Sequence, residues 1–511
     1  MKKRENTKNY KYSIKMKQNT IYVGGGFIEQ QYTYVLPIIF KYCEINKIKK
    51  IIFELPPSSK FYKNEYFKKN LKKFEIVEQK KAISFFFRNK YIRFSIVFFK
   101  AFIYALKINR SDILKKTSFF KSEFDHAVWD TCLNGSLNYL NPNLYIKIFS
   151  SVKTFEISLL AKLLKKHDLK AVFLNHSCYF YRAMLSEFRK QNKIELYGQA
   201  DFNFHNHDAR KDSNPTMLKK NFVKFLKNKV PQEEINNYWQ KRVKGFSIYE
   251  SANDAHQNIK NIRNFEVPNN ILMLHVFRDS SYGYLDKKRI FVDYADWLIY
   301  TLKIIENSNE LWGIKFHPIS KRWGENSHKI FQEFIDDLFN GKLPKNFKLI
   351  NDEVSNYKIM QKCKRLVTFW GTCHIESASF GLKPITIRET QLSFFDKNLV
   401  FKPRTLKSYK NLLTTKKMKI FEMDKKQISI SRFLLYLREN VLNFVKDTNQ
   451  HAITRGDSLK YVNKNLIKNI KNINQYKNFL EENGEILSSK FTHTVTKKYT
   501  KIIKKKYCDK S

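Results

Sequence analysis

Short apolar runs that stop abruptly at glycine, proline or polar residues constrain the fold of this chain more than any other feature. Helical patterns separate these runs, and a strand-helix-strand alternation is typical of parallel βαβ units. The chain therefore predicts an α/β fold built on parallel sheets. The expected strands lie at residues 20–23, 50–55, 170–174, 194–197, 271–277, 313–316, 347–350, 366–369 and 384–387. The expected helices include residues 28–43, 156–167, 181–190, 293–305, 330–339, 356–363 and 376–380, and residues 60–120 read as helical and basic.

A chain of 511 residues is long enough to form two domains. We place a boundary at the Val267-Pro268 step, which separates two series of alternating strands and helices. The expected architecture is two Rossmann-type α/β domains that face a cleft. The expected parts are a basic arm at 1–19, an acceptor-side domain at 20–267, a nucleotide-binding domain at 268–457 and a Lys-rich helical tail at 458–511. A solvated tail and an anchor for anionic lipid are both open readings of this last segment.

The formal net charge of +48 is extreme for a chain in which 42% of the residues are hydrophobic. That hydrophobic content excludes a disordered chain. The charge suits nucleic acid, an anionic membrane surface or an anionic substrate. A second explanation is an AT-rich genome, because Lys, Asn, Ile, Phe and Tyr are all frequent. No aromatic-plus-basic module of recognisable spacing is present, which argues against nucleic acid as a partner.

Six scattered cysteines without a CxxC pair are typical of a reducing, cytoplasmic compartment and argue against a zinc ribbon. The basic residues 1–20 lack the apolar core of a signal peptide. The chain has no uninterrupted run of about twenty apolar residues, so it does not predict a membrane-spanning helix. We therefore expect a cytoplasmic protein.

Residues 82–108 form the most apolar helical segment, and basic residues such as Arg93 and Lys100 interrupt it. One interpretation is a helix that lies in a membrane interface, with aromatic side chains on one face. The other is a helix packed on the protein's own core, with lysines that extend their charged ends to water. The sequence leaves both open.

His317-Pro318 follows an apolar strand directly. Proline removes a backbone donor and forces the preceding residue into an extended conformation, so it ends the strand and fixes the position of the imidazole. An imidazole N–H there can donate to a phosphate. The alternative is a histidine satisfied by a backbone carbonyl.

Gly371-Thr372 follows another strand and opens a helix. The start of a helix presents unpaired N–H groups, and glycine lets a ligand approach the backbone closely. Thr372 can instead be a simple N-cap. Glu376 lies one turn further along the same face, where it can bind ribose hydroxyls or be an exposed surface charge.

Three polar residues, His275, Arg278 and Asp279, follow the first strand of the second half. Arg278 can pair with a phosphate. Asp279 and His275 are candidates for catalysis, and Asp279 can equally cap the next segment.

Two further features have alternative readings. The turn Gly24-Gly25-Gly26 is either a plain loop or a cleft loop that faces the donor phosphates from the opposite wall. Residues 205–208 (His-Asn-His-Asp) look like a fragment of a metal site, but no third ligand is identifiable beyond a guess at Asp201. We therefore interpret them as a polar loop and expect no metal. Nucleophilic catalysis is poorly supported, because GxSxG is absent and Cys178 lacks a base.

In order and spacing, these blocks resemble the bacterial capsule and surface polysaccharide glycosyltransferases of the GT-B fold. This group has a His-Pro motif and includes the Kdo transferases and several sialyltransferases that use CMP-sugars. The resemblance covers about residues 20–400, and no single motif carries it. The matching stretches are residues 175–179, 197–198, 238–245, 275–279, 291–298, 317–318 and 371–376.

The resemblance implies a metal-independent enzyme without a cofactor. His317 and Pro318, with Gly371 and Thr372, would bind the donor phosphate, and Glu376 would hold ribose. The paired acids that precede a glycine in some relatives are not apparent, because residues 351–354 have the acids without the glycine and residues 481–484 lie in the tail. The catalytic base is therefore left open.

We accordingly expect a glycosyltransferase that moves a sugar from a nucleotide sugar, with a CMP-sugar favoured, to a surface or capsular polysaccharide. Its expected partners are the donor, a glycan or glycolipid acceptor and the anionic inner membrane at its cytoplasmic face. One rival is a polyol-phosphate transferase of the CDP-glycerol type. Another is a non-catalytic, basic membrane-surface protein. An inverting and a retaining reaction are both compatible with the sequence.

Overall fold

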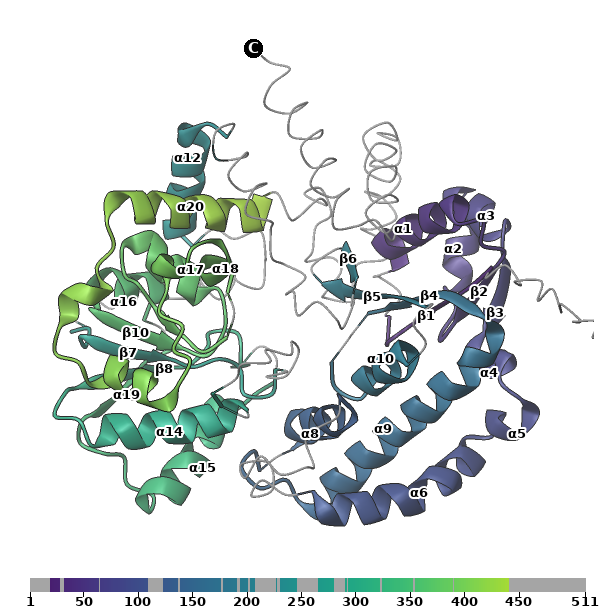
Figure 1. Cartoon of the computed structure of the whole chain (residues 1–511), viewed down its shortest axis with the longest axis horizontal. Coiled ribbons are helices and arrows are strands. Elements are labelled where there is room, and N and C mark those ends of the chain that lie inside the picture. Colours follow the sequence, from purple (N-terminus) through teal and green to yellow (C-terminus); the bar gives the residue numbers. More distant parts are fainter. Residues whose placement is uncertain are drawn as a thin grey trace, which may run out of the picture.

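The computed structural model shows two α/β halves, each built on its own sheet (Figure 1). It describes residues 19–27, 32–63, 65–108, 123–136, 138–175, 178–190, 194–200, 203–206, 227, 230–245, 265–279, 290–291, 293–321, 324–352, 354–388 and 390–440. The expected arm up to residue 18 and the expected tail at 458–511 lie outside these residues.

The first sheet is parallel except at one edge. Its strand order is β3-β2-β1-β4-β5-β6, and β6 pairs with β5 in the antiparallel direction. The strands β1, β2 and β4 are almost entirely buried, as expected for a parallel sheet with helices on both faces. The strands are β1 (Thr20–Gly24), β2 (Lys50–Phe53), β3 (Glu75–Glu78), β4 (Leu169–Leu174), β5 (Glu195–Ala200) and β6 (Asn203–Asn206).

The second sheet is parallel throughout, with the order β11-β10-β7-β8-β9. Its central strands β7, β8 and β10 are fully buried. The strands are β7 (Asn270–Met273), β8 (Trp312–Lys315), β9 (Phe347–Ile350), β10 (Arg365–Thr368) and β11 (Ile385–Thr386).

Helices connect the strands and cover the sheets. In the first part of the chain they are α1 (Tyr32–Ile45), α2 (Ser59–Lys63), α3 (Glu65–Leu71), α4 (Gln79–Ala82), α5 (Phe85–Arg88), α6 (Lys90–Lys107), α8 (Glu123–Gly135), α9 (Leu144–Leu164), η3 (Lys165–His167), α10 (Tyr181–Arg189) and α12 (Gln232–Val243). In the second part they are α14 (Tyr294–Glu306), α15 (Ser327–Phe339), α16 (Asn356–Lys362), α17 (Cys373–Phe380), α18 (Gln391–Phe395), η5 (Lys397–Leu399), α19 (Leu406–Thr414), η6 (Met418–Phe421) and α20 (Lys425–Asn440).

Each sheet reverses its direction of growth beside its first strand. The second sheet adds β8 and β9 on one side of β7, and the chain then returns to place β10 on the other side. The first sheet does the same at β1 and β4. In parallel α/β sheets, ligands bind beyond the carboxyl ends of the strands at such a reversal. The topology therefore points to the ends of β7 and β10.

The two halves are in direct contact through α8 and the segment after it. The indole of Trp129 donates to Asp293 at 3.2 Å, and the Tyr139 N–H donates to Glu333 at 2.7 Å. The Tyr139 ring also packs edge-on against Phe277, with the ring centroids 5.5 Å apart. Trp129 and Tyr139 belong to the hydrophobic core of the second sheet, although both precede it in the chain.

Helix α12 also lies before residue 267 in the chain but packs on the second half. Its residues Ile235, Tyr238 and Trp239 share a core with α20. The contact explains why α12 and α20 lie next to each other in Figure 1. The division of the chain at residue 267 stays a prediction.

The strand order confirms the expected fold class of two Rossmann-type α/β halves. Two local expectations were wrong. Residues 75–78 form the edge strand β3 inside a segment expected to be helical, because pairing with β2 overrides the lysine-rich surroundings. His205 and Asn206 lie in β6 instead of a loop, because β5 offers a free edge to which the chain folds back. His207, Asp208 and Asp201 lie outside the described residues.

None of the helices in the described ranges combines the length and the apolar character needed to cross a bilayer.

Burial of Lys315 in β8 gives a pH-dependent prediction. The side chain is fully buried, its Nζ donates to the Asn351 carbonyl at 3.0 Å, and burial lowers its pKa to about 8. Below pH 8 the lysine is charged in both states, so the folded state carries the cost of a buried charge. As the pH rises from 8 towards 10.5, the folded state loses its proton before the unfolded state does, and stability rises.

We expect Lys315→Met to be more stable than the parent at pH 7, by roughly 1–3 kcal/mol. The difference should shrink as the pH approaches 10, which thermal unfolding at pH 7 and pH 10 measures. Lys407→Met, at an exposed lysine of α19, is the matched control. A stability difference between Lys315→Met and the parent that is the same at both pH values would contradict the account.

Candidate functional site

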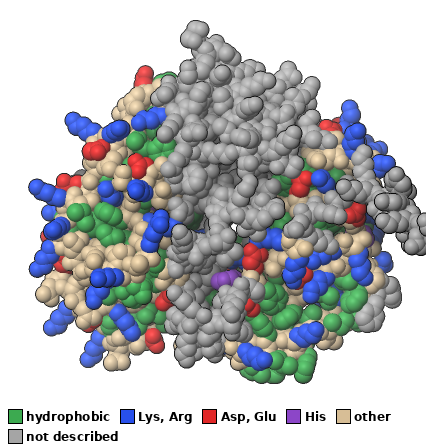
Figure 2. All heavy atoms as spheres, in the orientation of Figure 1, with side chains coloured by type: hydrophobic (Ala, Val, Ile, Leu, Met, Phe, Trp, Pro, Cys, Tyr) green, Lys and Arg blue, Asp and Glu red, His purple; other side chains and the backbone are tan. Residues whose placement is uncertain are grey.

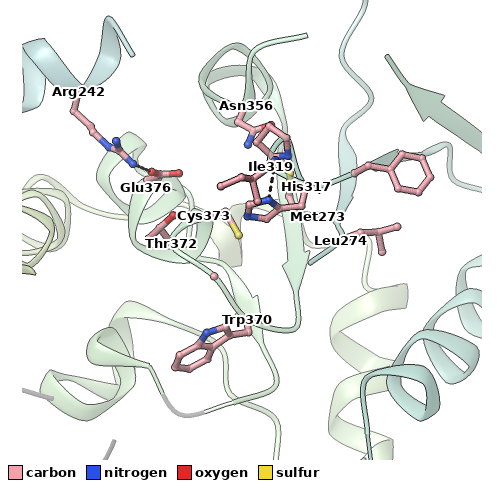
Figure 3. Close-up of a pocket in the computed structure, with 13 residues that line it drawn as sticks. Arg242, Met273, Leu274, His317, Ile319, Asn356, Trp370, Thr372, Cys373 and Glu376 are labelled. Atoms are coloured by element: carbon pink, nitrogen blue, oxygen red, sulfur yellow. Dashed lines mark hydrogen bonds and ion pairs between the residues drawn. The ribbon is translucent and has the colours of Figure 1, made fainter. Parts of the chain in front are cut away.

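A pocket lies at the carboxyl edge of the second sheet, where the ends of β7, β8 and β10 meet (Figure 3). It encloses about 80 Å³, and about 610 Å³ when the adjoining space open to solvent is counted. Its lining combines five of the sequence-predicted site residues with apolar and polar neighbours. The lining residues are Arg242, Met273, Leu274, Phe316, His317, Pro318, Ile319, Asn356, Trp370, Gly371, Thr372, Cys373 and Glu376.

His317 follows β8 and is held in one orientation by the next turn. The Ile319 N–H donates to His317 Nδ1 at 3.2 Å (Figure 3). The Ser320 hydroxyl donates to the His317 carbonyl at 2.8 Å. Because Nδ1 accepts a hydrogen bond, a neutral imidazole carries its proton on Nε2. His317 is therefore prepared to act as a hydrogen-bond donor through Nε2.

Gly371 connects β10 to α17 and approaches His275 closely. Its φ of +116° lies in the region that favours glycine, and a side chain there would meet the His275 ring at 3.4 Å. The turn thus brings the backbone at the start of α17 against the end of β7. The conformation is what favours glycine at this position.

Thr372 occupies the N-cap position of α17, as the alternative reading expected, but its side chain makes no capping hydrogen bond. The Ile375 and Glu376 N–H groups donate to the Thr372 carbonyl as the first turn begins. The first backbone N–H groups of a helix have no acceptor within the helix. The helix dipole adds partial positive charge at the same end. The start of α17, which lines the pocket, is therefore suited to an anion.

Glu376 is buried and forms an ion pair with Arg242 of α12, with side-chain exposures of 4% and 2% (Figure 3). Both groups line the pocket, and the Tyr357 hydroxyl donates to the same Glu376 oxygen, Oε1, at 3.4 Å. Glu376 is therefore not an exposed helix charge. Its carboxylate ties α17 to α12 and also forms part of the pocket wall.

His275 lies at the end of β7, with its ring centroid 5.4 Å from that of His317. Its Nδ1 lies 3.2 Å from the Val276 carbonyl, which can only accept, so Nδ1 carries the proton and Nε2 is an acceptor in the neutral ring. Asp279 Oδ2 lies 3.8 Å from His275 Nε2. The pair can thus take up a proton, with Asp279 next to the resulting charge.

Arg278 does not line the pocket. Its N–H donates to Glu325 at 2.8 Å, and its carbonyl accepts from Asn134 at 2.8 Å and from the Tyr179 hydroxyl at 3.3 Å. Arg278 is therefore placed where the two halves meet, and its predicted phosphate contact stays a prediction. The buried Glu325, which sequence reasoning missed, also accepts from the Phe277 N–H at 3.0 Å and so fixes the loop after β7.

The glycine turn after β1 gives its N–H groups to a carboxylate of the protein. The Gly25 and Gly26 N–H groups donate to Glu54 Oε2 at 2.7 and 2.9 Å. The Tyr181 hydroxyl donates to Glu54 Oε1 at 2.9 Å. The turn, Gly24 included, does not line the pocket, and its role as a cleft loop for donor phosphates stays a prediction.

Sequence reasoning assigned no role to Arg242, Asn356 and Trp370, which complete the pocket. Asn356 is buried at the start of α16, and its Oδ1 has no hydrogen-bond partner within the described part of the chain. The Trp370 ring stacks with the Arg388 guanidinium, 4.5 Å from the ring centroid. The only sequence signal for a place in the pocket was that Trp370 follows a predicted strand and Asn356 begins a predicted helix.

Burial favours the protonated form of the two thiols near the site. Burial raises the pKa of Cys373 to about 12, and burial also raises that of Cys178 well above its ordinary value. A nucleophilic cysteine needs a lowered pKa. The arrangement therefore provides hydrogen-bond donors, an anion-binding helix start and one proton acceptor, without a thiolate nucleophile.

Comparison with known proteins gives a weak likeness only. No family model and no curated protein matches the chain. Among solved structures, UDP-GlcNAc 2-epimerase from Methanocaldococcus jannaschii in complex with UDP-GlcNAc and UDP is 15% identical at a TM-score of 0.24, over 82% of this chain and 99% of that one. A glycosyltransferase from Rickettsia africae is 12% identical at a TM-score of 0.26, over 83% and 95%.

Anabaena HepE in complex with UDP-glucose is 9% identical at a TM-score of 0.26, over 83% of this chain and 96% of that one. TM-scores this low do not establish a common fold. The fold class of this chain rests on its own strand order.

The buried ion pair gives a stability prediction. In Glu376→Ala, Arg242 keeps its charge without its partner, and such a loss costs roughly 3–5 kcal/mol. The double variant Arg242→Met/Glu376→Leu should recover most of that stability, because it removes both charges and fills the space. Denaturant unfolding measures both.

The control for this prediction is Glu44→Ala, which breaks the half-exposed pair with Lys73 and should cost less than about 1 kcal/mol. If Glu376→Ala unfolds at the same denaturant concentration as Glu44→Ala, the pair does not hold α12 on α17.

Proposed function

We propose that the chain is a glycosyltransferase that binds a nucleotide-sugar donor in the pocket at the carboxyl edge of the second sheet. One observation supports this most: His317 and the start of α17, two anion-binding groups from separate strand ends, line the same pocket. The pocket also lies where parallel α/β sheets bind nucleotides, at the reversal between β7 and β10.

In this proposal the donor phosphate lies against Gly371 and Thr372 and accepts a hydrogen bond from His317 Nε2. Gly371 has no side chain to obstruct the phosphate, and the helix start supplies N–H donors. Glu376 Oε1 is engaged by Arg242 and Tyr357, so a ribose hydroxyl would donate to the other oxygen. Asn356 Oδ1 is a second acceptor for the nucleoside.

The proposed groups act on the charge that develops during transfer. When the bond between the sugar and the phosphate breaks, negative charge grows on the phosphate oxygen that leaves. A fixed N–H donor and the positive end of a helix stabilise that charge. The residues present can provide this stabilisation without a metal ion, which agrees with the metal-independent reaction that we propose.

His275 is the proposed base for the acceptor hydroxyl. Its Nε2 is an acceptor in the neutral ring, and Asp279, 3.8 Å away, favours the imidazolium that forms. Asp279 in this arrangement assists His275 and does not itself take the proton.

The finer assignments rest on the motif resemblance alone. They are a CMP-sugar as donor and a surface or capsular glycan as acceptor.

A thermal-shift panel of CMP, CDP, UDP and GDP tests the donor site. A nucleotide at a hundredfold excess over its Kd stabilises a folded protein by about 2.7 kcal/mol, so the preferred nucleotide should raise the unfolding temperature selectively. His317→Ala should weaken its binding by about tenfold or more, because a hydrogen bond to a charged group is lost. His328→Ala, at an exposed histidine of α15, is the matched control.

Equal binding by His317→Ala and the parent would contradict this placement of the phosphate. Selective stabilisation by CDP, together with a phosphodiester in the product, would favour the polyol-phosphate transferase instead.

A further inference from the structure

Helix α6 presents large apolar side chains to solvent along most of its length. We call Tyr91, Phe94, Ile96, Phe98, Phe99, Ile103 and Leu106 the α6 outer face. Phe99 is 70% exposed, Tyr91 is 74% exposed and Leu106 is 56% exposed. Phe94 and Phe98 pack on each other with ring centroids 5.1 Å apart, and Phe98 stacks on Phe102 at 6.1 Å. The result is a continuous aromatic ridge.

The fully buried residues of α6 are small, although the partly buried Tyr104 also packs its ring against Phe124 and Phe155. Val97, Ala101 and Ala105 are its buried residues, and the first two pack against Val152 of α9. A helix of a globular protein normally buries its large apolar residues and exposes its polar ones. In α6 most of the large apolar side chains are exposed instead. The contact with α9 therefore fixes the helix in place but leaves most of its apolar surface unused.

The start of α9 extends the same apolar surface. Leu144, Tyr145 and Phe149 are exposed by 46%, 73% and 48%. The two helices pack side by side, and α6 lies on the outer side of α9 at the lower rim of the molecule (Figure 1). Apolar and basic side chains alternate along the lower right of the surface, where α6 lies (Figure 2). Exposed apolar surface of this extent marks an interaction site.

Basic residues border this surface. Lys90, Lys100 and Lys107 of α6 are exposed, and α6 contains no acidic residue. Lys153 of α9 lies over the Phe149 ring at 5.6 Å from its centroid. The acidic residue of α9, Glu156, is paired with Arg93 at 3.2 Å. The positive charge around the apolar centre is therefore not neutralised by α6 or α9.

We propose that the α6 outer face and the start of α9 bind the surface of an anionic lipid bilayer. Aromatic and aliphatic side chains would enter the boundary between headgroups and acyl chains, and the lysines would contact the anionic headgroups. The charge selects this occupant: a second copy of the same face would place lysines against lysines, whereas anionic lipid complements them. The proposal goes beyond the donor site and does not depend on it.

Vesicle co-sedimentation of the full chain tests this directly. The probes are vesicles of phosphatidylcholine with and without phosphatidylglycerol. The double variant Phe99→Ser/Leu106→Ser keeps the net charge of +48 and removes two of the inserted side chains. It should bind the anionic vesicles about tenfold or more weakly than the parent. Lys100→Gln/Lys107→Gln should bind more weakly as well, and its binding should be less sensitive to salt.

The matched control is Leu343→Ser/Leu406→Ser, at two leucines of the second half that are 39% and 44% exposed. It should bind vesicles as the parent does, and circular dichroism should show that all variants are folded. The proposal is overturned if the parent does not sediment with anionic vesicles, or if Phe99→Ser/Leu106→Ser sediments equally well. It is also overturned if the face instead supports a concentration-dependent dimer that excludes vesicles. Nucleotide binding is independent of these outcomes.

Discussion

The reversal of strand order beside β7 is the constraint on which the candidate site depends. Because β8 and β10 flank β7 in one parallel sheet, their carboxyl ends open on the same edge, although their sequences are far apart. His317, His275 and Gly371 are brought together by that geometry. Glycine at position 371 suits the last connection, because its φ of +116° is strained for any residue with a side chain. The strand order thus determines where the pocket lies, and the side chains at the strand ends determine its chemistry.

The buried pair of Arg242 and Glu376 adds a second level of organisation. A buried ion pair contributes little net stability, but loss of one partner is costly. Here the pair connects α12, which precedes the second sheet in the chain, to the helix whose start lines the pocket. Glu376 therefore has a structural partner as well as its proposed role toward ribose. A loss of nucleotide binding in a Glu376 variant would therefore not by itself identify a ribose contact.

The alternation of apolar runs and helices was enough to predict most strands of both sheets, because buried parallel strands leave strong, short hydrophobic signals. The polar residues at the strand ends predicted five members of the pocket. Arg242 was not predictable, because its contact with Glu376 joins positions far apart in the chain. Glu54 was missed for the same reason, so the contact of its carboxylate with the Gly25 and Gly26 N–H groups was not predicted. Edge strands β3 and β6 depend on a neighbour's free edge, which local sequence does not encode.

The central claim is that a nucleotide phosphate binds His317 Nε2 at the start of α17. Nitrogen-15 NMR of the histidine side chains during a nucleotide titration tests this most directly, with the ring signals assigned by substitution. The account predicts that the Nε2 signal of His317 shifts as a proton donor to phosphate, that the signals of neighbouring His275 move to a smaller extent, and that those of His328 stay unchanged. Saturable nucleotide binding that leaves both His317 and His275 unperturbed would contradict it.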